Sequence, residues 1–300
     1  MRGIFACIVV FDHVAAECCP HALVFSRFIY WGDLAVAVFF GLSGYGLMKQ
    51  LNGNHDYMKR FWPNRLAKLL PVYVIMTCFA LGQGMRGDFN VLHRIVTKLS
   101  VVDAGWYCCV LLIFYLIFWL GNRGEQTNDG AGPLFAVVGV LIWSAVSSLF
   151  LEPFCYVRNG AFAIGLLIGW KSDSAYLLLR KYRRLVSVLG LWLVIIYSNY
   201  SLFMLQGPLA KYVNCAMWVL VVVAISMKVQ FGNVALRYLG RISYEIYLSH
   251  MFVLGELLHW FPQRQSSWLV FATIGGTLAM ATALHWIVGK VFPARKVRTV

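Results

Sequence analysis

Residues 134–151 read LFAVVGVLIWSAVSSLFL, eighteen consecutive residues without a charged side chain. The hydrocarbon core of a bilayer is about 30 Å thick, so a helix that crosses it needs roughly 17–25 mostly apolar residues. The segment has that length. It also lacks the strict alternation of polar and apolar residues that is typical of a strand in a membrane barrel. We therefore expect a transmembrane helix at this position.

Segments of the same character recur along the whole chain. The chain is 60% hydrophobic and 13% charged, whereas soluble domains carry about 25% charged residues. Within lipid every backbone amide must find a partner in the protein, which favours helices. The sequence thus predicts an all-α, polytopic membrane helix bundle with about ten transmembrane helices. Besides 134–151, the expected spans are 3–20, 31–49, 66–83, 104–120, 154–170, 185–199, 210–227, 239–259 and 267–288.

The basic residues predict the orientation of the bundle. With Met1 in the cytoplasm, the cytoplasmic loops and tail carry 18 Lys and Arg residues, against 7 in the opposite loops. Cytoplasmic loops of membrane proteins carry such an excess, so we expect both termini inside. The net charge of +14 then reports topology, and no nucleic acid is expected as a partner.

The polar interruptions between spans, of which 121–133 is one of the longest, are too short to fold alone. We expect a single integral-membrane domain over residues 1–300. The first eleven residues resemble a secretory signal, but Asp12, His13 and Glu17 stand where a small-residue cleavage site would lie. We interpret this segment as a retained first span.

No cysteine pair or histidine motif in the chain has metal-ligand spacing, so neither a metal nor a resident cofactor is expected. Five histidines stand alone in the sequence, and we interpret them as surface or packing residues. They are His21, His55, His93, His259 and His285.

Ionisable residues inside spans are costly and mark candidate functional groups. Arg2 and His13 are eleven residues apart, which at about 100° per residue places them on one face of a helix, roughly 16 Å apart along its axis. Asp12 points about 100° away from His13 and is a poor candidate to orient it. Taken alone, Arg2 and His13 could also be an interfacial anchor and a satisfied buried histidine.

A second polar group lies in the segment Gly240–His250. Ser243, Tyr247 and His250 fall at positions i, i+4 and i+7, which form one stripe of a helix, and Tyr244 and Glu245 flank it. Such a stripe could line a site. It could also join helices by hydrogen bonds, and that is the favoured role for Ser243.

Two further motifs lie around the second and third spans. Small residues around Ser43 in Phe39-Phe-Gly-Leu-Ser-Gly-Tyr45 permit close helix approach. Ser43 is rejected as a nucleophile because the final glycine of a nucleophile elbow is absent. Arg65 and Lys68 in the following loop suit positive-inside anchoring, and they would also suit a phosphate-bearing donor.

The order of these motifs resembles the integral-membrane acyltransferase-3 family. The resemblance rests on Arg2 and His13 with ten residues between them, on Phe39-Phe40-x-x-Ser43-Gly44-Tyr45, and on Arg65-x-x-Lys68-x-x-Pro71. Trp106-Tyr107 with Phe114-Tyr115 is similar to the family's fourth-span signature. Ile242-Ser-Tyr-Glu-Ile-Tyr-Leu-Ser-His250 is similar to its late-span signature. The resemblance covers essentially the whole chain.

This resemblance implies a ten-helix membrane enzyme that moves an acyl group, commonly acetyl from acetyl-CoA, to hydroxyls of cell-envelope glycans. His13 and Arg2 match the family's essential residues, and Arg65 and Lys68 match its basic residues before the third span. The expected location is the cytoplasmic (inner) membrane of a bacterium. The chain departs from the family at Leu111, where many members carry Glu. The residues expected to line the acceptor or the site are Ser43, Trp106, Tyr115, Ser243, Tyr244, Tyr247 and His250.

The expected mechanism follows from these assignments. His13 would act as general base toward the acceptor hydroxyl, since an unperturbed imidazole titrates near working pH. Arg2 would hold CoA phosphates at the cytoplasmic edge, and Arg65 and Lys68 would join it in binding the donor. The expected partners are acyl-CoA, a glycan and the bilayer, with the oligomeric state open. Two alternatives also stay open: a transporter or flippase of lipid-linked sugars, and a non-catalytic relative.

Overall fold

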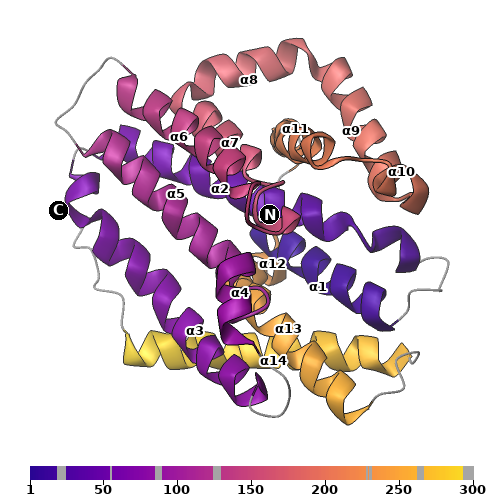
Figure 1. Cartoon of the computed structure of the whole chain (residues 1–300). Helices are drawn as coiled ribbons and strands as arrows, with labels where there is room; N and C mark the ends of the chain where they lie inside the picture. The colour runs from indigo at the N-terminus through magenta and orange to yellow at the C-terminus, as the bar shows by residue number, and fades with distance from the viewer. Residues whose placement is uncertain are drawn as a thin grey trace.

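The computed structural model of the protein describes residues 1–18, 25–54, 56–84, 90–123, 130–227, 229, 232–261 and 267–292. Within these residues every regular element is a helix (Figure 1). The 3-10 turns are η1 (Phe25–Phe28), η2 (Tyr57–Arg60) and η3 (Pro153–Cys155). The α-helices are α1 (Arg2–Cys18), α2 (Trp31–Gly53), α3 (Phe61–Gly84), α4 (Val91–Lys98), α5 (Trp106–Asn122), α6 (Ala131–Ser147), α7 (Gly160–Trp170), α8 (Ser172–Lys181), α9 (Arg183–Tyr197), α10 (Tyr200–Met204), α11 (Pro208–Ser226), α12 (Val234–Arg241), α13 (Ser243–Trp260) and α14 (Ser267–Val291).

Each of the ten segments expected to span the membrane overlaps at least one α-helix, and the all-helical fold is confirmed. Four described helices are long and apolar enough to cross a bilayer: Trp31–Gly53, Tyr57–Gly84, Pro208–Ser226 and Trp268–Val291. The pair Pro153–Trp170 and Ser172–Lys181, bent by 106°, would be a fifth if it is one broken span. Because α5 and α6 are apolar but only 17 residues long, the number of ten spans stays a prediction.

The surface of the bundle supports the membrane assignment. Large apolar side chains are exposed along several helices, among them Ile142 (58% exposed), Leu191 (62%) and Phe271 (74%). Water-soluble proteins rarely expose extended apolar surfaces of this kind. The protein is therefore a helical membrane protein.

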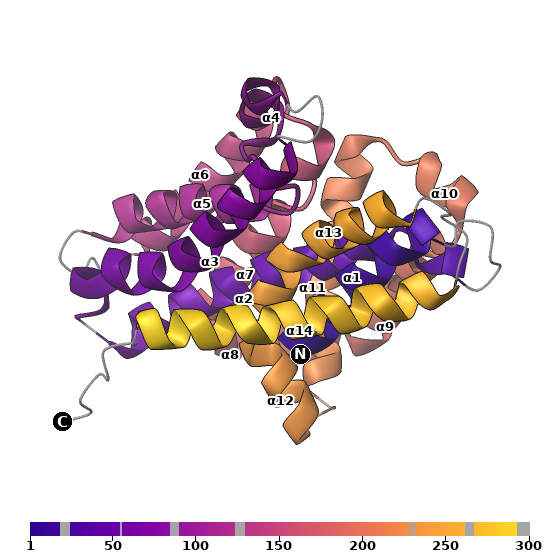
Figure 2. The ribbon, with the colours of Figure 1, turned by 90° about the horizontal axis from the view of Figure 1, so that it is seen from below.

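The expectation of one continuous helix over 239–259 is wrong. The segment is divided between α12 and α13 at Ile242, whose backbone N–H donates to the carbonyl of Tyr238 (3.2 Å). The start of α1 packs directly against the end of α12, because a Cβ added at Gly3 would lie 2.6 Å from the Cβ of Leu239. As a result α12 projects from the bundle (Figure 2), and Ser243 becomes the first residue of α13.

Helices α2 and α7 form the most closely packed pair at the centre of the bundle (Figure 1). The predicted close approach at the small residues of α2 is confirmed. A Cβ on Gly165 would collide with the backbone of Gly41, and a Cβ on Gly44 would collide with the carbonyl of Phe162. Small residues allow helix backbones to approach in this way inside membranes.

Helix α1 lies between two groups of helices. It packs against α2 on one side and against α12, α13 and α14 on the other. The long helix α14 runs along α13 at the edge of the bundle (Figure 2). This arrangement brings residues of α1, α2, α3, α5, α12, α13 and α14 to one cavity.

Candidate active site

A cavity of about 670 Å³ lies among these seven helices, and we call it the basic cavity. It contains four cationic side chains, from Arg2, Arg65, Lys68 and Arg241. Three of the sequence-predicted site residues do not line it, namely His13, Trp106 and His250. The eight predicted residues that do line it are Arg2, Ser43, Arg65, Lys68, Tyr115, Ser243, Tyr244 and Tyr247.

Helical periodicity explains why residues far apart in the sequence share this cavity. Tyr107, Leu111 and Tyr115 stand four residues apart and form one stripe of α5 that faces the cavity. Leu111, where many members of the resembled family carry Glu, is buried there. On the α13 wall, the hydroxyl of Tyr244 donates to the carbonyl of Leu69 (3.0 Å), which ties α13 to α3.

The cations of the basic cavity are not neutralised. Within the described part of the chain, no carboxylate forms an ion pair with Arg2, Arg65 or Lys68. Arg65 is instead held by neutral groups. Its Nη2 donates to Oε1 of Gln50 (3.0 Å) and to the hydroxyl of Tyr57, and its guanidinium lies 5.3 Å from the ring centre of Tyr115. Because Arg carries five fixed donors, this neutral support leaves donors for an anion.

Three aromatic rings pack on one another in the wall of the basic cavity. Phe39, Tyr107 and Tyr247 line the cavity and pack on one another, with centroid distances of 6.3 Å (Phe39–Tyr107), 6.1 Å (Phe39–Tyr247) and 5.1 Å (Tyr107–Tyr247). All three are buried. We call them the ring cluster.

His13 and His250 meet beyond the ring cluster. Their ring centres are 5.1 Å apart, and the ring of His250 lies 5.8 Å from that of Tyr247. Nδ1 of His250 is 2.6 Å from the carbonyl of Tyr247. A carbonyl only accepts, so Nδ1 carries the proton and Nε2 is left as an acceptor. Nε2 is buried, and none of the described residues bonds to it.

Two predicted site residues, His13 and His250, therefore contact each other outside the lining of the basic cavity. The stripe Ser243–Tyr247–His250 does lie on one helix, but it runs from the basic cavity past the ring cluster to His13. Arg2 lines the basic cavity and His13 does not. The sequence of α1 alone could not predict this difference, since the ring cluster beside His250 comes from α2, α5 and α13.

Trp106 has a different environment from the one expected. Its ring packs on Phe154 (5.4 Å between centroids), and the guanidinium of Arg158 lies 5.2 Å from its ring centre. Arg158 is buried, forms an ion pair with Asp33 and donates to the carbonyl of Phe154 (2.8 Å). Sequence reasoning missed this pair, because Asp33 and Arg158 lie 125 residues apart.

The interpretation of His285 as an isolated surface or packing residue is wrong. His285 on α14 and Glu245 on α13 both line the basic cavity, and Nδ1 of His285 is 2.7 Å from Oε1 of Glu245. Arg241 also lines the cavity and was missed. His21 and His55 lie outside the described residues. Among the residues that are described, no group of three or more His, Cys, Asp or Glu side chains is placed to hold a metal.

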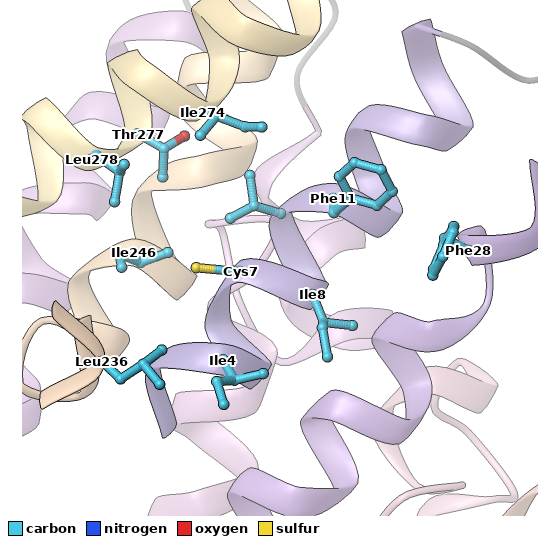
Figure 3. A pocket seen from close by; sticks show the side chains of 11 residues that line it. Ile4, Cys7, Ile8, Phe11, Phe28, Leu236, Ile246, Ile274, Thr277 and Leu278 are labelled. Atoms are coloured by element: carbon cyan, nitrogen blue, oxygen red, sulfur yellow. The ribbon is translucent and has the colours of Figure 1, made fainter. Parts of the chain in front are cut away.

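A second cavity, of about 410 Å³, lies between α1 and α14 (Figure 3). Its walls are apolar side chains such as Ile4, Ile8 and Phe11, with Cys7 and Thr277 among them. It lies on the face of α1 opposite to Arg2 and His13, since positions 4, 8 and 11 are about half a turn away from positions 2 and 13. It contains no charged side chain.

The fold and the site define a polytopic helical membrane protein. Its basic cavity carries cations that form no ion pair with a carboxylate among the described residues, and a pair of imidazoles lies nearby. A family model described as an acyltransferase domain, Acyl_transf_3, matches residues 1–286. The chain belongs to the acyltransferase-3 family, so the protein is a membrane acyltransferase. Neither a curated protein nor a solved structure matches it.

Proposed function

We propose that this acyltransferase moves an acyl group, acetyl in the simplest case, from acyl-CoA to a hydroxyl of a cell-envelope polysaccharide or lipid-linked glycan. His13 is the general base in this proposal. The enzyme would work in the cytoplasmic membrane of a bacterium, with ten spans and both termini inside. The observation that carries the proposal is the cluster of unneutralised cations in a cavity inside a membrane protein.

The cation cluster suits the nucleotide end of CoA. CoA carries phosphate groups at one end and a long, thin pantetheine arm at the other. Arg and Lys bind phosphate oxygens through charge-assisted hydrogen bonds. Arg2, Arg65 and Lys68 would hold the phosphates, and the arm would extend along the stripe Tyr115–Leu111–Tyr107 toward the ring cluster.

The distance along α1 supports a donor of this shape. Arg2 and His13 belong to the same helix, and eleven residues at 1.5 Å each separate them by roughly 16 Å. That is about the length of a pantetheine arm. Because His13 does not line the basic cavity, the proposal requires side chains in its wall to move when donor and acceptor are both bound.

The chemistry would proceed at the imidazole pair. His13 takes the proton of the acceptor hydroxyl while the hydroxyl oxygen attacks the thioester carbonyl. The carbon–sulfur bond breaks, and the CoA thiolate receives the proton. Nε2 of His250, which is a buried acceptor with no partner among the described residues, can accept a hydrogen bond from His13 or from the acceptor hydroxyl and so orient either one.

Replacement of His13 tests the proposal. Cells that express His13→Gln should lose acylation of their envelope glycan by about 100-fold or more, the usual contribution of a general base. The measurement is the ester content of purified glycan by mass spectrometry. His93→Gln, an exposed residue of α4, is the matched control and should keep full activity. A correctly inserted His13→Gln variant with normal glycan acylation would refute the assignment.

A further inference from the structure

The pair His285–Glu245 is a candidate catalytic unit that the transfer mechanism does not use. Glu245 is buried at 9% side-chain exposure, whereas the imidazole of His285 is 48% exposed. Nδ1–H of His285 donates to Oε1 of Glu245 (2.7 Å), so its Nε2 keeps a free lone pair. A carboxylate that fixes the tautomer of an accessible imidazole is the usual arrangement of a general base.

The pair lies well inside the basic cavity. His285, Val288 and Gly289 of α14 line the cavity, together with Phe292 directly after the helix. Phe292 is near the end of the helix, and His285 precedes it by seven residues, or roughly 10 Å along the axis. Glu245 lies two residues before Tyr247 of the ring cluster on α13. His285 and Glu245 therefore both line the cavity that the ring cluster also lines.

Of the imidazoles of His13, His250 and His285, the basic cavity is lined by that of His285. Phe39, Tyr107 and Tyr247 pack on one another in the wall of the cavity, and His13 does not line it. A donor bound by the cations of the basic cavity, as proposed, would place its thioester in the cavity that His285 lines and that His13 does not line.

From this geometry we infer a second activity, hydrolysis of acyl-CoA at His285–Glu245 when no acceptor is bound; it rests on the proposed donor. Nε2 of His285 takes a proton from water, and the water oxygen forms a bond to the thioester carbonyl carbon. The carbon–sulfur bond breaks, and the leaving thiolate takes the proton from the imidazolium. The products are the free carboxylic acid and CoA. Glu245 is a positioning residue that holds the ring and stabilises its charged form.

A purely structural role for the pair, as a link between α13 and α14, makes a different prediction. Loss of such a link would lower stability and leave chemistry in the cavity unchanged in each folded molecule. Hydrolysis without acceptor therefore separates the two roles, provided that folding is measured on the same samples.

The test uses the purified full chain in lipid nanodiscs with acetyl-CoA and no glycan. Release of CoA is followed with a thiol reagent, and thermal unfolding is recorded in parallel. We expect steady release by the wild-type protein, a fall of about 100-fold in His285→Gln, and a smaller fall in Glu245→Gln, which keeps an acceptor but loses the charge. The control His93→Gln, at an exposed position of α4, should release CoA at the wild-type rate.

The outcomes also separate this inference from the proposed function. If wild-type protein acylates glycan but releases no CoA without it, the hydrolysis is refuted and the transfer stands. The same conclusion follows if folded His285→Gln and Glu245→Gln both release CoA normally. If the wild-type protein neither acylates glycan nor hydrolyses or binds acetyl-CoA, both proposals fail.

Discussion

At the scale of single residues, Arg65 shows how the basic cavity prepares an anion site. Its guanidinium is held by Gln50, by the hydroxyl of Tyr57 and over the ring of Tyr115, all of them neutral groups. The side chain is thus fixed before any ligand arrives, and its charge remains uncompensated. A fixed, planar donor suits a phosphate better than a flexible one does.

Arg65→Ala should therefore weaken use of the donor. A hydrogen bond to a charged group contributes about 1.5–3 kcal/mol, so we expect the KM for acyl-CoA to rise roughly 10- to 150-fold with a smaller change in kcat. Arg65→Lys should recover part of the loss. Initial rates over a range of acyl-CoA concentrations give both constants.

Arg60→Ala is the matched control for this experiment, because Arg60 is exposed on η2 and does not line the cavity. It should leave KM unchanged. An unchanged KM in Arg65→Ala would mean that the cation cluster does not hold the donor.

The sequence led to part of this site and missed the rest for a physical reason. Arg2, Arg65 and Lys68 were expected together, and they meet in one cavity. The bond between His285 and Glu245 was missed, since it joins residues 40 apart on two helices. Periodicity within a helix tells which side chains share a face. It does not tell which helix that face will meet.

At the scale of elements, the hydropathy of the sequence predicted where the helices lie but not where a helix is interrupted. All ten apolar segments contain a helix, because backbone N–H and C=O groups in lipid must form hydrogen bonds within the protein, and a helix provides them. The break at Ile242 between α12 and α13 was missed. It depends on the start of α1 packing against Gly240 and Leu239, and that is a tertiary contact. The short helices α4, α8, α10 and α12 lie outside or at the edges of the predicted spans.

The contact between α2 and α7 yields a prediction about stability. Gly165→Ala would place a methyl group against the backbone of Gly41, and backbone cannot move aside as a side chain can. Overpacking of this kind costs about 1–3 kcal/mol. We expect a lower Tm in detergent, measured by the fluorescence of a thiol or tryptophan reporter.

Gly275→Ala provides the comparison, because a Cβ at Gly275 of α14 meets nothing within 4 Å. Its Tm should stay within about a degree of wild type, since surface substitutions change stability little. Equal melting of the two variants would show that α2 and α7 are not in close contact.

At the scale of the whole molecule, an apolar exterior surrounds a polar interior cavity. The exposed side chains of α6, α9 and α14 include Ile142, Leu191 and Phe271, while the cations of Arg2, Arg65 and Lys68 line the basic cavity. Charged groups inside membrane proteins mark substrate pathways. The proposed orientation, with both termini in the cytoplasm, would open this cavity to cytoplasmic acyl-CoA.

Reporter fusions test that orientation. Alkaline phosphatase folds only outside the cytoplasm, so a fusion after Leu205 should be active and one after Lys181 inactive. Green fluorescent protein fused after Phe292 should fluoresce. The opposite pattern would place the basic cavity on the outer side and remove its access to cytoplasmic CoA.

Transfer of label by purified protein tests the central claim most directly. Protein in nanodiscs is incubated with acetyl-CoA labelled in the acetyl group and with envelope glycan, and the glycan is then separated and counted. Acyl transfer from the basic cavity predicts label in the glycan, lost on treatment with mild base as an ester would be, and absent with His13→Gln. Unlabelled glycan with the folded wild-type protein, whether or not free acetate forms, would contradict it.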